Sequence, residues 1–442
     1  MGELVSKIGK VHHEFGVFKL KDILIKNDAG DWGFDPDENA VRVIRSTNFT
    51  NEGKLNLEDV AFRTLKPHKL KDKKLYEGEL LIERSGGSDN QPVGRVGLIT
   101  GSIVEETSAF ANFIQRISIN NDIIDSQFLF YCLQQMYEMG ITASMQYQTT
   151  GIRNLDWKLY IKTILPKPRK PEQTAIATIL SKVDEAIEAT QNSIKAAEKL
   201  KKALMQNLLM GKLRPDGIWR KEDEFQMTKI GLIPKEWKIK TVKEISTQVT
   251  DGEHTTPERS ESGFYLLSAR NIKNSYLDLS NVDYVKEEEL RKIQKRCNPQ
   301  AGDIIISCSG TIGNVCMVPE GLDAGMVRSA ALIKLKKDEI EPEFAELVFQ
   351  SFSLQNQMKV SVASSVQGNI FQGAIRKLKI PYPPDGEERT QITQKIKGFS
   401  ALIIEKQTNI QNLQRLKKSL MQNLLTGKVR LPEVLIKQFT NG

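Results

Sequence analysis

The chain of 442 residues contains only four cysteines and four histidines, and it lacks long apolar runs. No apolar stretch approaches the roughly 20 residues that a membrane span needs. No two cysteines have the Cys-x-x-Cys spacing of a zinc site, and none stands near a histidine. Cys308 and Cys316 flank a glycine turn, but their apolar surroundings favour two buried core residues over a reactive thiol pair. We therefore expect a reduced, cytoplasmic protein without a metal site.

The motifs of common catalytic sites are also missing. There is no Gly-x-x-x-x-Gly-Lys-Ser/Thr phosphate loop, and the glycine turns at 86–87 and 309–313 lack the lysine or helix that a nucleotide site uses. There is no Asn/Asp-Pro-Pro-Tyr/Phe motif for amino-group methylation. No histidine has an i+4 partner or a nearby Gly-x-Ser-x-Gly serine. These absences favour a binding protein, and a stand-alone enzyme would have to show activity as the purified chain.

Charge is distributed unevenly along the chain. A composition of 39% hydrophobic and 27% charged residues is that of a soluble globular protein, and the net charge is +8. Residues 195–214 hold six basic side chains and one acidic, and residues 406–430 hold six basic and none acidic. This balance favours a polyanionic partner, although many cytoplasmic proteins are mildly basic.

The chain contains an internal repeat. Residues 200–214 recur at 416–430 with 12 of 15 positions identical, at an offset of 216. Repeats decide how the whole fold is interpreted, and a match of this length records a duplication. The length of the chain independently predicts two or three domains.

The offset extends backwards along a helical pattern. Apolar residues spaced mostly three or four apart form one narrow stripe on an α-helix in each copy. The aligned residues are Ile176, Leu180, Val183, Ile187, Ile194, Leu200, Leu204 and Leu208 with Ile392, Ile396, Phe399, Ile403, Ile410, Leu416, Leu420 and Leu424. Each helix follows a proline-rich break and ends at Gly211 or Gly427. About 38 residues give roughly 57 Å of helix. We predict that the two stripes cover each other.

The segments before the helices correspond more weakly. The landmark pairs are 43–49 with 266–272, 78–86 with 302–310, and 150–152 with 367–370. Each copy has short β-like runs, at 80–83, 96–100, 304–307 and 331–334, and helical stretches, at 126–139 and 342–360. We predict an α+β fold with two similar globular domains, each followed by a long helix.

The predicted domains follow this pattern. They are a first globular domain at 1–165, a first helical spacer region at 166–215, a second globular domain with its linker at 216–380, a second helical spacer region at 381–432, and a C-terminal tail at 433–442.

Two similar domains on paired helices suggest a protein that binds DNA. If a pseudo-two-fold axis relates the copies, the helices run antiparallel and two half-sites are read with an unread gap, as symmetric dimers do. Parallel helices would read one contiguous site. We favour the antiparallel pairing, because each helix follows its own domain and a single chain can then close on itself.

Base reading calls for arginine, amide and hydroxyl side chains at loop positions. The first half offers Arg42, Arg45, Ser46, Asn48, Arg84, Ser85, Arg95, Gln146, Gln148, Thr149, Thr150 and Arg153. The second half offers Ser268, Arg270, Asn271, Lys273, Ser307, Ser309, Arg328, Ser364, Ser365, Gln367 and Asn369. The near-identical helix ends predict two docking sites for one kind of partner. The residues predicted to bind it are Leu204, Met205, Asn207, Leu208, Leu420, Met421, Asn423 and Leu424.

With these features the chain resembles the specificity subunit of a Type I restriction–modification enzyme, over essentially its whole length. The resemblance is carried by Ile230-Gly-Leu-Ile-Pro-Lys-Glu-Trp237, by Gly302-Asp303-Ile304 with Ser309-Gly310-Thr311-Ile312-Gly313, and by the paired Leu-Met-Gln-Asn-Leu-Leu-x-Gly-Lys-x-Arg helix ends. The first half departs from the pattern, because Phe15-Gly-Val-Phe-Lys-Leu lacks the Ile-Pro-x-x-Trp lead-in of residues 233–237.

The resemblance implies a non-catalytic chain with two target-recognition domains, an antiparallel coiled coil and a bipartite, asymmetric site on double-stranded DNA. It implies docking to two methylation subunits, which use S-adenosylmethionine, and through them to motor–nuclease restriction subunits, which use ATP and magnesium. The chain itself would hold no cofactor, and the complex would serve in phage defence.

Two other classes remain open. One is the recognition subunit of a non-translocating methylase–nuclease system. The neighbouring reading frames would distinguish this class from a Type I system. The other is a coiled-coil scaffold whose globular ends bind proteins. Salt-dependent binding of DNA by the chain would distinguish a DNA-recognition subunit from this scaffold.

Overall fold

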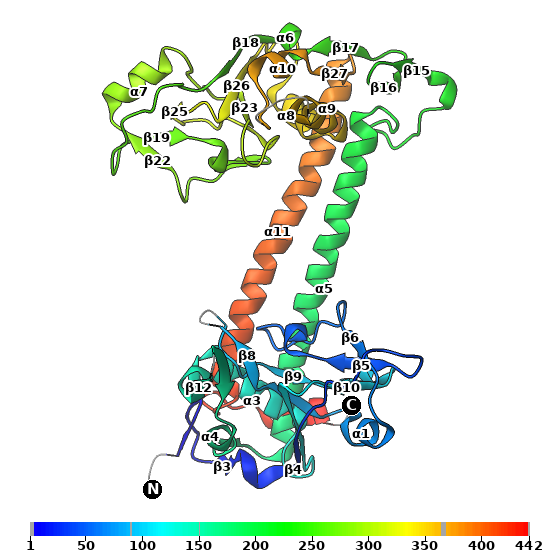
Figure 1. The fold of residues 1–442 in the computed structure, drawn as a ribbon, viewed down its shortest axis with the longest axis vertical. Coiled ribbons are helices and arrows are strands. Elements are labelled where there is room, and N and C mark those ends of the chain that lie inside the picture. The colour runs from blue at the N-terminus through cyan, green and yellow to red at the C-terminus, as the bar shows by residue number, and fades with distance from the viewer. Residues whose placement is uncertain (1–3, 89–90, 150, 364–367, 441–442) are drawn as a thin grey trace. The chain divides into compact units, whose positions relative to one another are not determined.

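The computed structural model describes residues 4–88, 91–149, 151–363 and 368–440 (Figure 1). The chain forms two compact units. Unit 1 consists of residues 1–191 and 408–442, and unit 2 consists of residues 192–407. Each unit therefore combines one globular part with a portion of each long helix.

The two predicted helices are present. Helix α5 (Lys170–Leu209) has 40 residues and α11 (Gly386–Leu424) has 39. Just past their ends, Gly211 and Gly427 have φ of +68° and +73°, a conformation that L side chains avoid. The predicted helix ends at the two glycines are thus confirmed, whereas α5 begins at Lys170, inside the proline-rich stretch that was predicted to precede it.

Within unit 1 the portions of α5 and α11 run antiparallel. Lys417 Nζ lies 2.7 Å from Asp184 Oδ1, and further along, Arg430 Nε donates to Glu172 Oε1 at 2.6 Å. From residue 417 to residue 430 the numbers of the contacted residues fall from 184 to 172, so the two segments run in opposite directions. In unit 2, Leu208 of α5 lies in one core with Ile392 of α11. Antiparallel packing is therefore found in unit 1, and in unit 2 the end of α5 lies in one core with the start of α11.

Not all of the predicted stripe is buried. Ile176 and Ile392, one pair of equivalent positions, are fully buried, but Leu200 and Leu416 are 49% and 47% exposed. The prediction that this pair is covered is wrong, since the described residues leave half of each side chain open. Both copies expose the same position to the same extent.

Each unit contains a four-stranded antiparallel sheet with the same strand order, β4-β11-β7-β9 in unit 1 and β18-β26-β23-β24 in unit 2. The strands are β4 (Leu24–Ala29), β7 (Leu80–Glu83), β9 (Val96–Leu98), β11 (Ile114–Ile119), β18 (Ser246–Asp251), β23 (Ile304–Ser307), β24 (Val315–Met317) and β26 (Ala330–Leu335). The four predicted β runs all fall in these sheets. A shared strand order confirms that the globular parts are copies of one fold.

A three-stranded sheet also recurs, as β10-β5-β6 and as β25-β19-β22. In each, the central strand pairs in parallel with one neighbour and antiparallel with the other. The strands are β5 (Val41–Ile44), β6 (Ala61–Arg63), β10 (Ser108–Phe110), β19 (Phe264–Leu267), β22 (Asp283–Val285) and β25 (Ala324–Met326). A two-stranded pair before each long helix completes the common pattern, with β3 (Gly16–Lys19) on β14 (Ile164–Lys167) and β17 (Lys238–Thr241) on β27 (Lys379–Tyr382).

Helices pack on these sheets at matching places. Helix α3 (Ser126–Glu138) confirms the predicted stretch at 126–139, and Asp125 caps it by accepting the N–H groups of Gln127 and Phe128. The stretch predicted as one helix at 342–360 is two helices, α8 (Pro342–Gln350) and α9 (Phe352–Ala363). Ser351 interrupts it, because its extended backbone ends α8 and its Oγ accepts the N–H of Leu354 in α9.

The third landmark pair is out of register. Leu155 N donates to Arg84 O at 2.8 Å, and the same bond in unit 2 runs from Ile370 N to Cys308 O at 3.1 Å. Leu155 therefore matches Ile370. Residues 150–152 do not match 367–370, because Gly151 belongs to the turn of an additional sheet of unit 1. That sheet has the order β12-β13-β8, with β8 (Ser85–Gly87), β12 (Gln146–Thr149) and β13 (Ile152–Leu155).

The first domain begins with the same hairpin as the second, although its sequence lacks the Ile-Pro-x-x-Trp motif of residues 233–237. Hairpin β1 (Val5–Ser6)–β2 (Gly9–Lys10) and hairpin β15 (Phe225–Thr228)–β16 (Gly231–Pro234) carry the same internal bond, from Ser6 Oγ to Gly9 O and from Thr228 Oγ1 to Gly231 O. The Lys-Ile-Gly of residues 7–9, repeated at 229–231, is the sequence signal for this match.

Phe15 takes the place of Trp237 behind these hairpins. A Cβ on Gly427 would lie 2.9 Å from the Phe15 ring, and a Cβ on Gly211 would lie 3.1 Å from the Trp237 ring and closer still to Pro234. Each long helix therefore ends against an aromatic ring where only glycine fits. The substitution of Phe for Trp concealed this match in the sequence.

All four cysteines are buried. Burial raises the pKa of the Cys308 and Cys316 thiols to about 12. The two thiols belong to different clusters of the core, as expected for packing residues. Across the described ranges, no helix is long and apolar enough to cross a membrane.

Candidate nucleic-acid interface

In unit 1, polar segments that are distant in sequence meet at the end of β7. Arg84 N donates to Phe113 O at 2.8 Å, Leu155 N donates to Arg84 O at 2.8 Å, and Ser46 Oγ donates to Ser85 O at 3.2 Å. These bonds bring together residues 45–47, 84–86 and 153–155. We call this surface the polar junction of unit 1.

Unit 2 builds the same junction at the end of β23. Cys308 N donates to Ser329 O at 2.8 Å, Ile370 N donates to Cys308 O at 3.1 Å, and Ala269 N donates to Ser329 Oγ at 3.0 Å. The polar junction of unit 2 therefore comprises residues 268–270, 308–310, 328–329 and 368–370. Backbone bonds of the two junctions correspond, while their side chains differ.

Many of the predicted DNA-binding residues gather at these junctions. In unit 1 they are Arg45, Ser46, Arg84, Ser85 and Arg153, with Gln146 and Gln148 on the neighbouring β12, and all are exposed or half-buried. In unit 2 they are Ser268, Arg270, Ser309, Arg328 and Asn369, which are likewise exposed or half-buried. Lys273 is half-buried on β20 (Ile272–Lys273). Thr150, Ser364, Ser365 and Gln367 lie outside the described residues, as does the side chain of Thr149.

Asn48 and Asn271 are structural residues. Asn48 is 2% exposed; its Oδ1 accepts the N–H of Arg45 at 2.9 Å and its Nδ2 donates to Asn56 O at 2.8 Å. Asn271 is 1% exposed and makes the same bonds, accepting from Ser268 N at 3.0 Å and donating to Asp278 O at 3.0 Å. Neither amide is available to a base, so the prediction that Asn48 and Asn271 bind DNA is wrong.

Arg95 and Ser307 are also buried. Arg95 forms a two-bond ion pair with the buried Glu83, at 2.8 and 2.7 Å, and its Nη1 donates to Phe49 O. In unit 2 the corresponding bond is made by Asn314, whose Nδ2 donates to Ile272 O at 3.0 Å. Ser307 Oγ donates to Thr311 O at 2.6 Å inside its own turn. These side chains hold the junction loops in place and do not reach the surface.

Arg42 is an anchor as well. Its Nε donates to Ser108 Oγ at 3.1 Å and its Nη2 to Ile103 O at 2.7 Å, and only 12% of the side chain is exposed. An arginine satisfied in this way has few donors left for a phosphate. The internal contacts of these five polar residues could not be inferred from residue type alone.

Each junction exposes an arginine held by a surface carboxylate. Arg45 Nη2 lies 2.8 Å from Asp59 Oδ2, and Arg270 Nη2 lies 2.6 Å from Asp283 Oδ1. Partial burial raises the pKa of Asp283, but the hydrogen bonds from Arg259 and Arg270 outweigh it and hold the pKa below its usual value. Asp59 is 93% exposed, and a pair with so exposed a carboxylate contributes little stability, so a phosphate can replace Asp59 beside Arg45 at small cost.

Sequence reasoning missed the loop at 251–257. Arg328 N donates to Glu253 O at 3.0 Å, which places this loop against the junction of unit 2. His254 Nε2 lies 2.8 Å from Asp251 Oδ2, and Arg296 Nη2 lies 2.9 Å from Asp251 Oδ1. The sequence signal for this loop is Gly252, which follows β18 as Gly30 follows β4 in unit 1. Only glycine fits there, because a Cβ on Gly252 would lie 2.4 Å from Met326 O.

Three of the predicted partner-binding residues are buried in the cores. These are Leu208, Met421 and Leu424; Leu204, Met205 and Leu420 are half-buried against the cores. Asn207 and Asn423 donate to their own helices, to Ala203 O and Ser419 O. The identity of the two helix ends is thus explained in part by packing. Matched residues that remain exposed are Leu200 and Leu416, Lys202 and Lys418, and Gln206 and Gln422.

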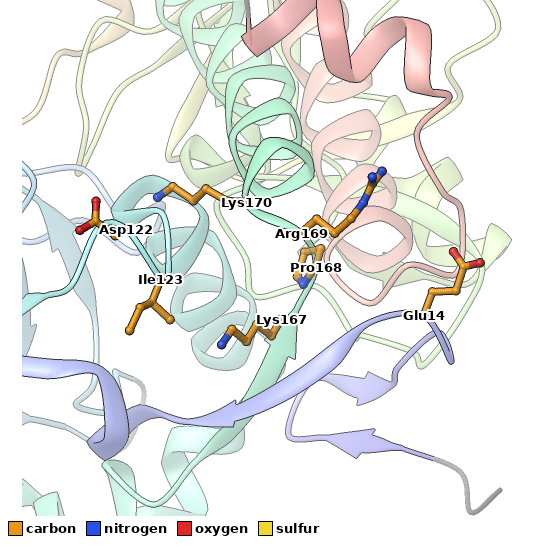
Figure 2. Close-up of a pocket in the computed structure, with 7 residues that line it drawn as sticks. All are labelled: Glu14, Asp122, Ile123, Lys167, Pro168, Arg169 and Lys170. Carbon is orange, nitrogen blue, oxygen red and sulfur yellow. The ribbon is translucent and has the colours of Figure 1, made fainter.

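A shallow cavity of about 460 Å³ lies at the start of α5 (Figure 2). Its lining combines basic and acidic side chains, and Figure 2 shows Lys167, Arg169 and Lys170 coming from one segment. Arg169 pairs with Glu433, and Lys170 Nζ donates to Asn121 O. Two of the three cations are therefore engaged within the protein. Among the described residues, no group of three or more His, Cys, Asp or Glu side chains could hold a metal ion.

The sequence matches the family model described as the Type I restriction modification DNA specificity domain twice, at residues 13–199 and 234–415. The two matches together span most of the chain. The chain belongs to this family. Each match covers one globular part and most of the long helix that follows it, as expected for a duplicated specificity subunit.

Known specificity subunits are similar to it over much of their length. The Type I restriction enzyme MjaVIII specificity subunit of Methanocaldococcus jannaschii is 25% identical over 362 residues, covering 80% of each chain. The Type I restriction enzyme EcoBI specificity subunit of Escherichia coli is 23% identical over 328 residues, covering 71% of this chain and 68% of that protein. The chain is thus a DNA-sequence-recognition subunit of the type I restriction–modification class.

Solved structures share the fold. The S subunit of a Type I restriction–modification system from M. genitalium matches with a TM-score of 0.56 and 16% identity, over 96% of this chain and 99% of that one. A chain from a study of complex assembly in the type I system matches with a TM-score of 0.56 and 14% identity, over 95% of this chain and all of the other. These likenesses support the α+β fold with two long helices.

Proposed function

We propose that this specificity subunit reads a bipartite, asymmetric site on double-stranded DNA, one part with each polar junction. The observation that carries the proposal is that the two junctions have the same backbone bonds and different side chains. Ser46 and Ala269 lie in equivalent segments, and the position of the half-buried Arg84 is taken in unit 2 by Cys308, which is buried and offers no side chain to a base. A conserved frame with changed side chains is what two readers of different base sequences require.

The charge of the chain is consistent with DNA as the ligand. The net charge is +8, and each junction carries arginines that are exposed or held by surface carboxylates. Arg328 is exposed, and no hydrogen bond or ion pair of its side chain is recorded among the described residues. An unengaged guanidinium can bind guanine or a phosphate with two hydrogen bonds.

Docking of two copies of a methylation subunit is the second part of the proposal. Leu200, Lys202 and Gln206 on α5 match Leu416, Lys418 and Gln422 on α11 in residue type and in exposure. Core packing does not require identical residues at exposed positions. The same exposed residues in both copies support two equivalent docking sites at the helix ends, with restriction subunits recruited through the methylation subunits.

The chemistry of the complex would reside in those partners. S-adenosylmethionine would serve the methylation subunits, and ATP and magnesium the motor–nuclease subunits, while this chain supplies DNA specificity and no catalytic residue. Its location would be the cytoplasm, and the biological role defence against phage.

Mapping of methylated adenines tests the proposal. The chain is co-expressed with the neighbouring methylation gene, and the host genome is mapped with and without it. Methylation at a split motif that depends on the chain is the expected result. A contiguous motif would instead favour parallel reading or the non-translocating system. Absence of chain-dependent methylation would contradict the proposal and favour a protein-binding scaffold.

A further inference from the structure

A cleft of about 540 Å³ lies within unit 1, between the loop at 52–58, residues 98–103, α3 and α5. Its lining includes the apolar side chains Leu55, Leu57 and Leu98, which are each half-buried. Half-buried leucines that line an open cleft leave apolar surface in water, which association with a partner would remove.

Carboxylates surround this apolar lining. Asp184 is paired with Lys417 at 2.7 Å, and Glu188 with Lys54 at 2.7 Å. Glu52, Glu58 and Glu185 also line the cleft and are exposed, and no ion pair of theirs is recorded among the described residues. The cleft therefore has an excess of negative charge in a chain whose net charge is +8.

This charge has a cost for the subunit. Asp184 and Glu188 stand four positions apart on α5, an arrangement of like charges that slightly destabilises a helix. Carboxylates also repel the phosphates of DNA, the ligand of this class of protein. Asp184 contributes to the fold through Lys417 and Tyr131. Neither fold stability nor DNA binding explains Glu52, Glu58 and Glu185, for which the described residues show no ion pair, so a separate ligand is a better explanation.

The second half of the chain lacks the acidic character of this cleft. Bonds between equivalent residues establish the match, since Glu58 N donates to Asn56 Oδ1 at 2.9 Å and Ser280 N to Asp278 Oδ1 at 3.1 Å. Ser280 therefore replaces Glu58. The positions on α11 that match Asp184, Glu185 and Glu188 are Ser400, Ala401 and Ile404. The acidic cleft is consequently a feature of the first half alone.

We propose that this cleft binds a basic segment of a partner protein, with an apolar side chain between the leucines and lysines or arginines against the carboxylates. Partners that dock on the repeated helix ends would occupy two equivalent places. Because the acidic cleft occurs only in the first half, its partner would bind at one place in the assembled complex. This contact would distinguish the first half from the second. That the partner is a subunit of the restriction–modification complex rests on the proposed function. The binding of a basic, partly apolar segment by the cleft does not.

Peptide binding to the purified full chain tests the proposal. The probe is a short fluorescein-labelled peptide of alternating arginine and leucine, followed by fluorescence anisotropy, and the companion probe has glutamate in place of arginine. The cleft variant is Glu58→Lys with Glu185→Lys. The matched control is Ser280→Lys with Ala401→Lys, which adds lysines at the equivalent positions of the other half. All four positions replaced lie at exposed or half-buried sites, and circular dichroism verifies folding.

The cleft variant is expected to weaken binding of the arginine peptide about tenfold or more, a change of about 1.4 kcal/mol. The control should bind as the unmodified chain does, and the glutamate peptide should not bind. Equal affinity of the unmodified chain and the cleft variant, or equal loss in the control, would overturn the proposal. Since the assay needs neither DNA nor a methylation subunit, its failure leaves the split-site proposal standing, and the reverse also holds.

Discussion

Arg430 and Glu172, which stand 258 positions apart, form a two-bond ion pair in which Nε and Nη2 donate to the two carboxylate oxygens at 2.6 and 2.8 Å. Unit 2 has the same type of contact, from Arg220 Nη2 to Glu388 Oε1 at 2.7 Å. Glu172 and Glu388 are equivalent positions at the starts of α5 and α11. In unit 1 the pair fastens residues that follow α11 to the start of α5, and in unit 2 it fastens residues that follow α5 to the start of α11.

Replacing Arg430 with Met should destabilise unit 1 by about 2 kcal/mol, because Glu172 is buried and would lose its charged hydrogen bonds. Arg415→Met is the matched control, since Arg415 is an exposed arginine on α11. Urea denaturation of both variants gives the comparison. Equal midpoints for the two variants would contradict a structural role for the pair.

Asn48→Ala and Asn271→Ala should each lower the free energy of unfolding by about 1–3 kcal/mol, because each leaves buried backbone groups without partners. Neither change should alter the recognised sequence, since neither amide reaches the surface. Asn409→Ala, at an exposed position of α11, serves as the control. Denaturation and methylation mapping of the variants check both parts. A changed recognition motif in either variant would show that the replaced asparagine takes part in reading the DNA.

The long helices could be predicted from the sequence because their signal is local and occurs twice. Apolar periodicity, a proline break and a terminal glycine each act within a few residues, and the second copy confirmed the first. The polar residues of the globular parts were harder to assign. Arg95 and Arg328 are the same residue type in loops, and only contacts with Glu83 and Phe49 bury the former. Such contacts join segments that the sequence alone does not bring together.

Acid should weaken unit 1 partly through Asp28. Burial raises the pKa of this carboxyl, but hydrogen bonds from Arg116, at 2.9 and 3.0 Å, and from Lys73 outweigh burial and lower it overall. Because the folded-state pKa lies below the unfolded value of about 3.9, the contribution is present above that pH and is lost as the pH falls through the folded-state pKa.

Asp28→Asn should therefore be less stable than the unmodified chain at neutral pH, and the difference should shrink on acidification below about pH 4. Urea midpoints at neutral and acidic pH measure it. Asp35→Asn is the control, because Asp35 is 97% exposed beside Arg63 and its pair should contribute little. A difference that stays constant with pH would show that the ion pair is not its cause.

Arg328→Ala should weaken binding to the cognate DNA by about 1–3 kcal/mol if the guanidinium contacts a base, and should relax the preference at one position of the motif. A phosphate contact would instead weaken binding to all sequences and reduce the salt dependence. Binding to cognate and scrambled duplexes over a range of salt concentrations distinguishes the two. Arg415→Ala is the control, and equal effects of both variants would exclude Arg328 from the interface.

Exchange of the first recognition domain tests the central claim most directly. Residues 15–165 are replaced by the corresponding region of another specificity subunit, the chimera is co-expressed with the methylation gene, and methylated adenines are mapped. A reader with two independent junctions predicts a split motif in which one half changes and the other stays the same. A motif that changes in both halves, or that becomes contiguous, would contradict recognition by two separate domains.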